Sequence, residues 1–252
     1  MDVLKGTTAF IVHGSMRESV RDFDRAHVWF CDLDALRQLD VSECPVLLPA
    51  EAARASRLTN SLERHRFEAR CALVRQALGK LVGAAPEALE FYDGISGKPH
   101  LVIPSGAEDG HLATLDFNLS HSENILALAV AFGREVGIDV EVVNYGVDAL
   151  GVAEVSFSKK ETEQLRALPP RERTLPFYRL WARKEAMSKA TGLGIAASPA
   201  PEAQEWSRLT LAHSFQFNFG EKEVVGALAL GAEVLANDAA WPVMNLQPQL
   251  SY

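Results

Sequence analysis

The chain has 252 residues, and its hydrophobic share of 48% is enough to build a substantial core in one domain or two. Its formal net charge of −8 excludes the basic excess that a general nucleic-acid-binding protein would show. The three cysteines match neither a disulfide framework nor a zinc site, so we expect a reducing compartment, the cytoplasm. No apolar run reaches ~18 residues, so no membrane span is expected.

The first part of the chain predicts a strand followed by two helices. Residues 1–25 have one lysine and a short apolar patch, too weak for a signal peptide, and we expect an extension ahead of the domain. His27–Leu33 is a short β-like run. The pattern then becomes helical in two pieces, Glu51–Leu58 and Ser61–Val82, the second with apolar residues at helical spacing.

These two helices carry the densest basic cluster of the chain. Its members are Arg54, Arg57, Arg64, His65, Arg66, Arg70 and Arg75. One interpretation is an ordinary solvated helix face. The other is a patch that binds phosphate, because the arginine guanidinium offers forked donors.

A strand, a turn and two further strands follow. Leu89–Asp93 predicts a strand, and Gly94–His100 predicts a turn by its glycine and proline content. Apolar and polar residues alternate from Leu115 to Ser120, which predicts a half-buried strand that ends in Ser120-His121-Ser122. The almost unbroken apolar run Ile125–Phe132 predicts a strand buried on both faces.

The next predicted strand, Val136–Val142, carries two acidic residues. Asp139 and Glu141 alternate with apolar residues, so both carboxylates project from one face. Taken alone, the pair fits a solvated edge. A hard divalent cation such as Mg²⁺ is the alternative, since it prefers oxygen ligands and completes its shell with water and phosphate. No cluster of histidine and cysteine competes for a softer metal.

A second chemical pattern lies on a helix predicted over Leu175–Ala190, with Thr174 as its N-cap and Gly192 as its end. Trp181, Glu185 and Lys189 fall on one stripe of this helix. A solvated Glu–Lys pair beside a packed tryptophan explains the stripe by itself. Combined with the acidic strand, the stripe indicates a metal-assisted reaction at phosphate.

The remaining elements complete an α+β pattern. The chain is expected to be helical within Asp148–Glu163, and Ser158 with Glu161 forms a capping-box pattern for a further helix. Three strands are expected at the end of the domain: Ser207–Ala212, His213–Phe219 and Val224–Leu230. Residues 237–252 are expected to form a tail.

A short internal sequence similarity suggests two related halves. Phe117-Asn-Leu119 and Phe217-Asn-Phe219 each precede an apolar strand and follow a long helix. We therefore predict two pseudo-symmetric α+β halves, residues 26–133 and 134–236, each a small antiparallel sheet with a long packed helix. An enclosed site would lie between them.

Several ordered motifs resemble one known family. Gly137-Ile-Asp-Val-Glu141 and Trp181-x-x-Lys-Glu-x-x-x-Lys189 resemble the two signature motifs of the 4′-phosphopantetheinyl transferases of the Sfp type. Further similar motifs keep the family's order: Arg64–Arg75, Gly97-Lys-Pro99, Phe117–Ser122 and Val155–Ser158. The resemblance covers about Val28 to Leu230.

The resemblance implies a magnesium-dependent transfer, with Mn²⁺ as a substitute. The 4′-phosphopantetheine arm of coenzyme A, the co-substrate, would move to a serine of an apo acyl- or peptidyl-carrier protein and release 3′,5′-ADP. Such carriers serve fatty-acid, polyketide or nonribosomal-peptide synthesis. It also implies a monomeric cytoplasmic enzyme with neither a nucleic-acid nor a membrane partner.

The resemblance also assigns roles to individual residues. The implied metal ligands are Asp139, Glu141 and Glu185, and the implied catalytic residues are Glu185 as general base, Lys189 and His121. The residues implied to bind coenzyme A are Arg57, Arg66, Gly97, Lys98, Pro99, Ser120, His121 and Lys189. Trp181 is expected to pack and set the helix.

Two other functions remain open at this point. One is another magnesium-dependent enzyme that acts on a nucleotide diphosphate. The other is a non-catalytic relative that only binds coenzyme A or a carrier protein. The second alternative is disfavoured by the joint presence of Asp139, Glu141, Glu185 and Lys189.

Overall fold

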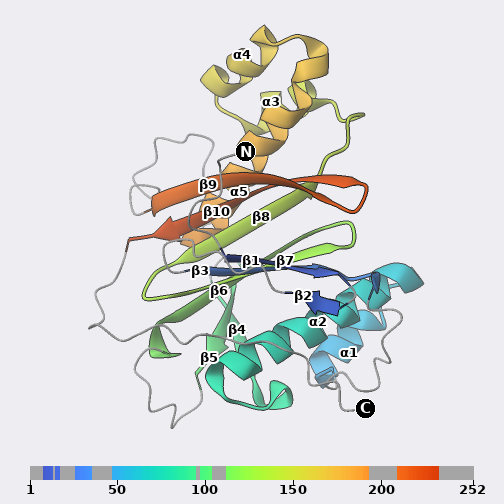
Figure 1. Cartoon of the computed structure of the whole chain (residues 1–252), viewed down its shortest axis with the longest axis vertical. Coiled ribbons are helices and arrows are strands. Elements are labelled where there is room, and N and C mark those ends of the chain that lie inside the picture. Colours follow the sequence, from blue (N-terminus) through green and yellow to red (C-terminus); the bar gives the residue numbers. More distant parts are fainter. Residues whose placement is uncertain are drawn as a thin grey trace.

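Two β-sheets pack face to face between two long helices (Figure 1). The computed structural model of the chain describes residues 8–13, 15–17, 26–35, 47–94, 97–103, 112–192 and 209–232. Within these residues no helix is both long enough and apolar enough to cross a membrane. The predicted tail over residues 237–252 lies outside the described residues.

The first sheet has five strands in the order β2-β1-β3-β7-β6. They are β1 Thr8–His13, β2 Ser15–Arg17, β3 Ala26–Asp32, β6 Leu115–Ser122 and β7 Ile125–Phe132. β1 pairs with β3 in parallel, and the other pairings are antiparallel. The predicted N-terminal extension therefore contributes two strands to this sheet.

The second sheet has three antiparallel strands in the order β8-β10-β9. They are β8 Val136–Val142, β9 Leu209–Phe219 and β10 Lys222–Gly231. The prediction of two strands that meet between Ala212 and His213 is wrong, because one continuous strand, Leu209–Phe219, pairs with β10.

Five α-helices and a hairpin flank the sheets in the described part of the chain. The α-helices are α1 Pro49–Ala55, α2 Ser61–Val82, α3 Ala149–Ser156, α4 Lys159–Ala167 and α5 Thr174–Thr191. The hairpin consists of β4 Glu90–Asp93 and β5 Pro99–Val102, and the 3₁₀ turns are η3 Pro86–Ala88, η4 Leu112–Thr114 and η5 Pro170–Glu172. The sequence predicted α2 with its observed bounds but did not predict β5.

Local sequence signals explain where the long helices begin and end. The side chain of Asn60 accepts hydrogen bonds from the first turn of α2, and α5 ends at Gly192, whose φ of 69° lies in the left-handed region that favours glycine. Thr174 is not the N-cap of α5, because Arg173 occupies that position without a side-chain cap. The predicted capping box of Ser158 and Glu161 is confirmed at the start of α4.

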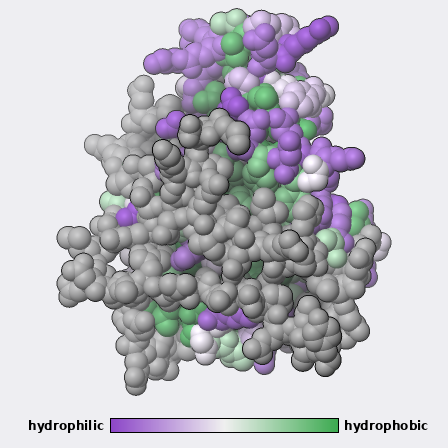
Figure 2. Space-filling model, in the orientation of Figure 1, coloured by the Kyte–Doolittle hydropathy of each residue, from purple (hydrophilic) through white to green (hydrophobic). Residues whose placement is uncertain are grey.

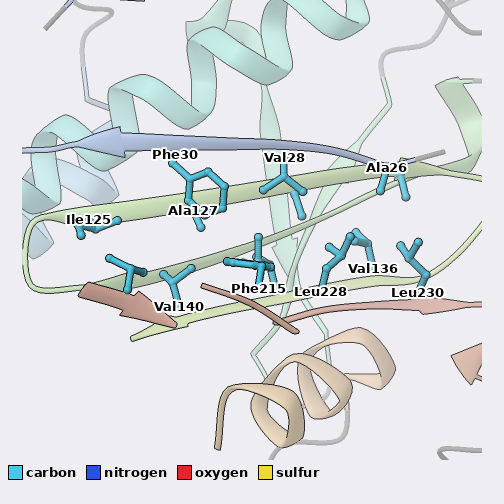
Figure 3. Packing of buried hydrophobic residues seen from close by; sticks show 14 of the residues in the cluster. Ala26, Val28, Phe30, Ile125, Ala127, Val136, Val140, Phe215, Leu228 and Leu230 are labelled. Atoms are coloured by element: carbon cyan, nitrogen blue, oxygen red, sulfur yellow. The ribbon is translucent and has the colours of Figure 1, made fainter. Parts of the chain in front are cut away.

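Side chains that alternate across the strands build a core on each face of the first sheet. The central core, between the two sheets, includes Val28, Phe30 and Ala127 from the first sheet and Val140, Phe215 and Leu228 from the second (Figure 3). On its other face the first sheet packs on α2, where Leu78 meets Phe117 and Leu128. The layers therefore run α2, first sheet, second sheet, α5.

Helix α5 approaches β8 closely because both present very small side chains. Ala182, Ala186 and Ala190 repeat every fourth residue and lie on the outer face of the second sheet. A Cβ atom on Gly137 would lie 2.0 Å from the carbonyl oxygen of Ala186. Only glycine fits there, so the glycine of the acidic motif brings β8 and α5 together.

The predicted α+β class with small antiparallel sheets and packed helices is confirmed, but the predicted pseudo-symmetry is not. Each part does contain a long helix followed by a hairpin, β6–β7 after α2 and β9–β10 after α5. The sheets differ, however, because the first has five strands with one parallel pair and the second has three. Hydrophilic residues dominate the surface at the α3–α4 end (Figure 2).

Candidate functional site

One pocket of about 710 Å³ lies between the two parts of the structure. From the N-terminal part it is lined by α1, α2, the β4–β5 hairpin and the end of β6. From the C-terminal part it is lined by Asp139, Glu141, Trp181, Glu185 and Lys189. The pocket therefore joins the two motifs that the sequence places about 45 residues apart.

Three carboxylates line the pocket from two elements of the C-terminal part. Asp139 and Glu141 leave β8 on the same side, as strand alternation requires, and Glu185 comes from α5. Burial raises the pKa of Glu141, and the neighbouring Asp139 raises it further. Burial also raises the pKa of Glu185, to about 7, with the two β8 carboxylates adding to the effect of burial and Lys189 opposing it.

Asp139 is the most buried of the three, with 3% of its surface exposed. Its Oδ1 accepts hydrogen bonds from Lys189 Nζ at 2.6 Å and from Ser120 Oγ at 2.9 Å. Burial nevertheless raises the pKa of Asp139, and these two bonds only oppose the rise. Its Oδ2 is buried and has no hydrogen-bond partner among the described residues.

The Ser120 hydroxyl is fully engaged in holding this group. It donates to Asp139, and it accepts from the backbone N–H of Val140 at 3.3 Å and from Lys189 Nζ at 3.1 Å. A serine hydroxyl has one donor hydrogen and two acceptor lone pairs, so its capacity is used. Ser120 thus orients an acid and a lysine as well as lining the pocket.

Helices α1 and α2 contribute a surface of the pocket that we call the cationic wall, which consists of Arg54, Phe67 and Arg70. The guanidinium carbons of Arg54 and Arg70 lie 5.4 and 5.2 Å from the centre of the Phe67 ring, so two cations flank one aromatic side chain. Burial lowers the pKa of Arg70, and within the described residues its guanidinium has no carboxylate at ion-pair distance. Such a partly desolvated cation is suited to bind an anion that enters the pocket.

His121 lies at the end of β6 between the cationic wall and the acids. Burial lowers its pKa, and the nearby charges of Arg70 and Lys189 lower it further. The imidazole is therefore biased toward its neutral form until an anion enters. Once phosphate is bound, His121, Arg70 and Lys189 would offer it donors from three elements.

Comparison with known proteins decides the family. The family model of the 4′-phosphopantetheinyl transferase superfamily matches residues 135–225. The 4′-phosphopantetheinyl transferase HetI of Nostoc sp. strain PCC 7120 is 37% identical over 173 residues, which cover 69% of this chain and 71% of HetI. The chain belongs to the 4′-phosphopantetheinyl transferase superfamily.

Other relatives bear the same description. The putative 4′-phosphopantetheinyl transferase slr0495 of Synechocystis sp. is 32% identical over 67% of this chain and 65% of its own length. A 4′-phosphopantetheinyl transferase of Bacillus subtilis is 34% identical over 49% of this chain and 50% of its own length. The chain is thus a member of a class of transferase enzymes, as the sequence motifs indicated.

The structure brings most of the predicted site residues to the pocket but not Lys98. Gly97 and Pro99 line the pocket. The Lys98 ammonium instead points into the protein, where it bonds to the carboxylate of Asp116 at 2.6 Å and to the backbone carbonyl oxygens of Val136 and Ala190. With only 8% of its surface exposed, Lys98 ties three elements together and is not placed to contact a nucleotide.

Arg57 and Arg66 do not line the pocket either. Arg66 forms a two-pronged ion pair with Asp34, at 2.8 and 2.7 Å, and a further one with Glu63. These bonds outweigh the effect of burial and raise its pKa. Three of the five N–H donors of Arg66 are engaged by Asp34 and Glu63, and Arg66 does not line the pocket, so its predicted role in binding coenzyme A lacks geometric support here.

The members of the arginine cluster that line the pocket are Arg54, Arg70 and Arg75, whereas the resemblance implied Arg57 and Arg66 as contacts of coenzyme A. Phe67, Arg70, Cys71 and Val74 share one stripe of α2, and this stripe lines the pocket. Their i, i+3, i+4, i+7 spacing was a readable signal. Arg75 also borders the pocket, yet it is buried and paired with Glu51 at 2.9 Å, which makes it structural.

The donor set fits a hard divalent cation, although the carboxylates form no complete cage. Among the described residues no group of three histidine, cysteine, aspartate or glutamate side chains converges closely enough to hold an ion alone. Mg²⁺ usually takes only one or two carboxylates and completes its shell with water and phosphate. The unpartnered Oδ2 of Asp139, with Glu141 and Glu185 lining the same pocket, fits that requirement.

Proposed function

We propose that this enzyme transfers the 4′-phosphopantetheine arm of coenzyme A to a serine of an apo acyl- or peptidyl-carrier protein, giving holo-carrier and 3′,5′-ADP. The observation that carries the proposal is the composition of the pocket between the two parts. Carboxylates and Lys189 enter it from the C-terminal part, and Arg54, Arg70 and His121 enter it from the N-terminal part. Attack of a nucleophile on a diphosphate needs the cationic side chains to bind the phosphates, and it needs the carboxylates to hold a metal ion and accept a proton.

The cationic wall would bind the substrate. Arg70 and Arg54 offer forked donors to phosphate oxygens, and Phe67 between them holds both guanidinium groups over one face of the pocket. His121 adds a donor on the side of Lys189. Binding the phosphates at several points fixes the diphosphate for in-line attack.

Asp139, Glu141 and Glu185 would hold Mg²⁺, or Mn²⁺ in its place, and the ion would neutralise charge on the diphosphate when bound. Glu185 is the candidate general base, since its carboxylate lines the pocket beside Lys189 and the two acids of β8. The carrier serine oxygen forms the new bond to phosphorus as its proton passes to Glu185. The bond from this phosphorus to the bridging oxygen breaks, and that oxygen leaves with 3′,5′-ADP.

Lys189 would stabilise the charge that develops on the leaving phosphate. Its ammonium is held by Asp139 and Ser120 at 2.6 and 3.1 Å, so it is already oriented before substrate enters. Donors fixed in advance contribute most to stabilising a transition state, because they need no reorganisation during the reaction.

The test is a transfer assay on several apo-carriers with coenzyme A and Mg²⁺, read by mass spectrometry. One phosphopantetheine should appear on one serine, the gain should vanish with EDTA, and Mg²⁺ or Mn²⁺ should restore it. Asp139→Ala is the matched control and should give no product while its circular-dichroism spectrum is unchanged. Failure of every carrier to gain mass, with another nucleotide diphosphate turned over instead, would overturn the proposal.

A further inference from the structure

Along one side of the core between the facing sheets, an edge strand of each sheet is joined to the other through side chains rather than through backbone pairing. β6 is an edge strand of the first sheet and β8 is an edge strand of the second. The backbone N–H groups of alternate β8 residues donate to side chains of alternate β6 residues, always 20 positions earlier. The pairs are Val136 to Asp116 at 2.8 Å, Ile138 to Asn118 at 3.0 Å, Val140 to Ser120 at 3.3 Å and Val142 to Ser122 at 3.0 Å. We call these four bonds the seam.

The seam explains why the polar face of β6 is buried. An edge strand presents N–H groups that need partners, and the N–H groups of β8 that point away from β10 find them here. Asn118 and Ser120 are accordingly only 4% and 7% exposed. The strand predicted from the alternation is present, but its polar side is more buried than a half-buried strand implies, because the seam covers it.

Two members of the seam also hold the acidic side chains. The Ser120 hydroxyl donates to Asp139, and the Ser122 hydroxyl donates to Glu141 Oε2, both at 2.9 Å. Each serine thus binds a carboxylate and the backbone N–H of the next residue. The seam is therefore the physical link between β6, which carries His121, and the two carboxylates of β8.

Asn118 is the member of the seam nearest to Asp139 that does not itself line the pocket. Its Oδ1 fixes the N–H of Ile138, the residue directly before Asp139. A leucine here would leave this buried N–H without its acceptor and would free the backbone at the base of the Asp139 side chain. A serine would keep an acceptor oxygen without adding a charge, as Ser120 and Ser122 do at the following positions of the seam.

We infer that Asn118 is a positioning residue of the transfer reaction, which sets the Asp139 carboxylate against Lys189 through the backbone of Ile138. This inference rests on the proposed function for its kinetic part only. Loss of the Asn118 acceptor should lower kcat and leave the KM for coenzyme A nearly unchanged, because the cationic wall belongs to α1 and α2.

The first measurement needs no activity. Amide hydrogen exchange of the folded wild-type chain should show protection of all four seam donors of β8. In Asn118→Leu the exchange rate of the Ile138 amide should rise on the order of tenfold, which corresponds to the loss of about one hydrogen bond. The exchange rate of the Asp139 amide, which points to β10, should not change. Exchange of the seam amides in wild type as fast as in an unfolded chain would overturn the seam itself.

The second measurement is steady-state kinetics on three variants well below their unfolding temperatures. Asn118→Leu should lose at least about tenfold in kcat, since a small misplacement of a reacting group is costly, and Asn118→Ser should recover most of it. Thr162→Val is the matched control. It removes a buried side-chain hydrogen bond of α4 to Ala153 and Ser158 and should lower the melting temperature but not kcat.

The outcomes separate the two proposals. If Asn118→Leu shows faster Ile138 exchange but a wild-type kcat, or if Asn118→Ser restores slow Ile138 exchange but not kcat, the positioning role is overturned. If Asn118→Leu does not fold, Asn118→Ser and the wild-type exchange pattern still decide the seam. A wild-type protein that transfers no phosphopantetheine but protects the four amides would refute the proposed function and leave the seam standing.

Discussion

Replacing Gly137 by alanine should separate the two motifs that make the site. The added Cβ would lie 2.0 Å from the carbonyl oxygen of Ala186 and 2.3 Å from the backbone nitrogen of Ala190. Both are backbone atoms of α5, so no side-chain rotation relieves the clash. Real Cβ contacts are essentially never shorter than 3.0 Å, so α5 and β8 must move apart by about 1 Å.

The size of this movement gives the expected effects. Overpacking of this kind costs about 1–3 kcal/mol of stability, which exceeds the roughly 0.5–1 kcal/mol that alanine gains over glycine within a strand. A shift of about 1 Å between Asp139 on β8 and Glu185 on α5 should cost on the order of 100-fold in kcat. The rate loss should therefore be far larger than any loss of folded protein explains.

The assay compares kcat and unfolding free energy for Gly137→Ala and for a control on the same helix. Gly192→Ala forces alanine to adopt a φ of 69° at the end of α5, where nothing lies within 4 Å of its Cβ. It should lose roughly 1–2 kcal/mol of stability with no change in kcat. A Gly137→Ala enzyme that keeps the wild-type kcat would refute the reasoning that this close approach sets the site.

Three further predictions follow from the pocket and its surroundings. Glu185→Gln should lower kcat by on the order of 100-fold with folding intact, and a wild-type rate would reduce Glu185 to a surface partner of a lysine, worth only ~0.3–0.5 kcal/mol. Arg70→Gln should raise the KM for coenzyme A by about tenfold or more, which is the scale of a charged hydrogen bond, whereas Arg66→Gln should change this KM little. A larger rise in KM for Arg66→Gln than for Arg70→Gln would restore the role predicted for Arg66 from the sequence. Burial alone would raise the pKa of Glu161, but the bonds from Lys184 at 2.7 Å and from the start of α4 lower it. The charged Glu161 therefore stabilises the folded protein at pH values above its usual pKa of 4.5. This stabilisation is lost as the pH falls through the lower pKa of the folded state. Glu161→Gln should therefore reduce the unfolding free energy by about 1–3 kcal/mol at pH 7, and equal losses at pH 7 and pH 3 in denaturant titrations would contradict this.

Part of the fold and site was readable from the sequence because it depends on local spacing. Periodicity alone set the bounds of α2, β7 and β8, since apolar residues must follow the period of the element that buries them. Strand alternation likewise put Asp139 and Glu141 on one side, and helical spacing put Glu185 and Lys189 on one stripe.

Only the tertiary structure decided which polar residues serve the pocket and which serve the scaffold. Lys98 lies between a glycine and a proline, where a turn would leave it in solvent, yet acceptors from β6, β8 and α5 surround its ammonium after folding. Arg66 and Arg70 look alike in the sequence, but only Arg66 meets a carboxylate brought from the end of β3. The burial of the polar face of β6 was not readable for the same reason: its partner, the free edge of β8, arrives only when the sheets pack, and no local pattern encodes that meeting.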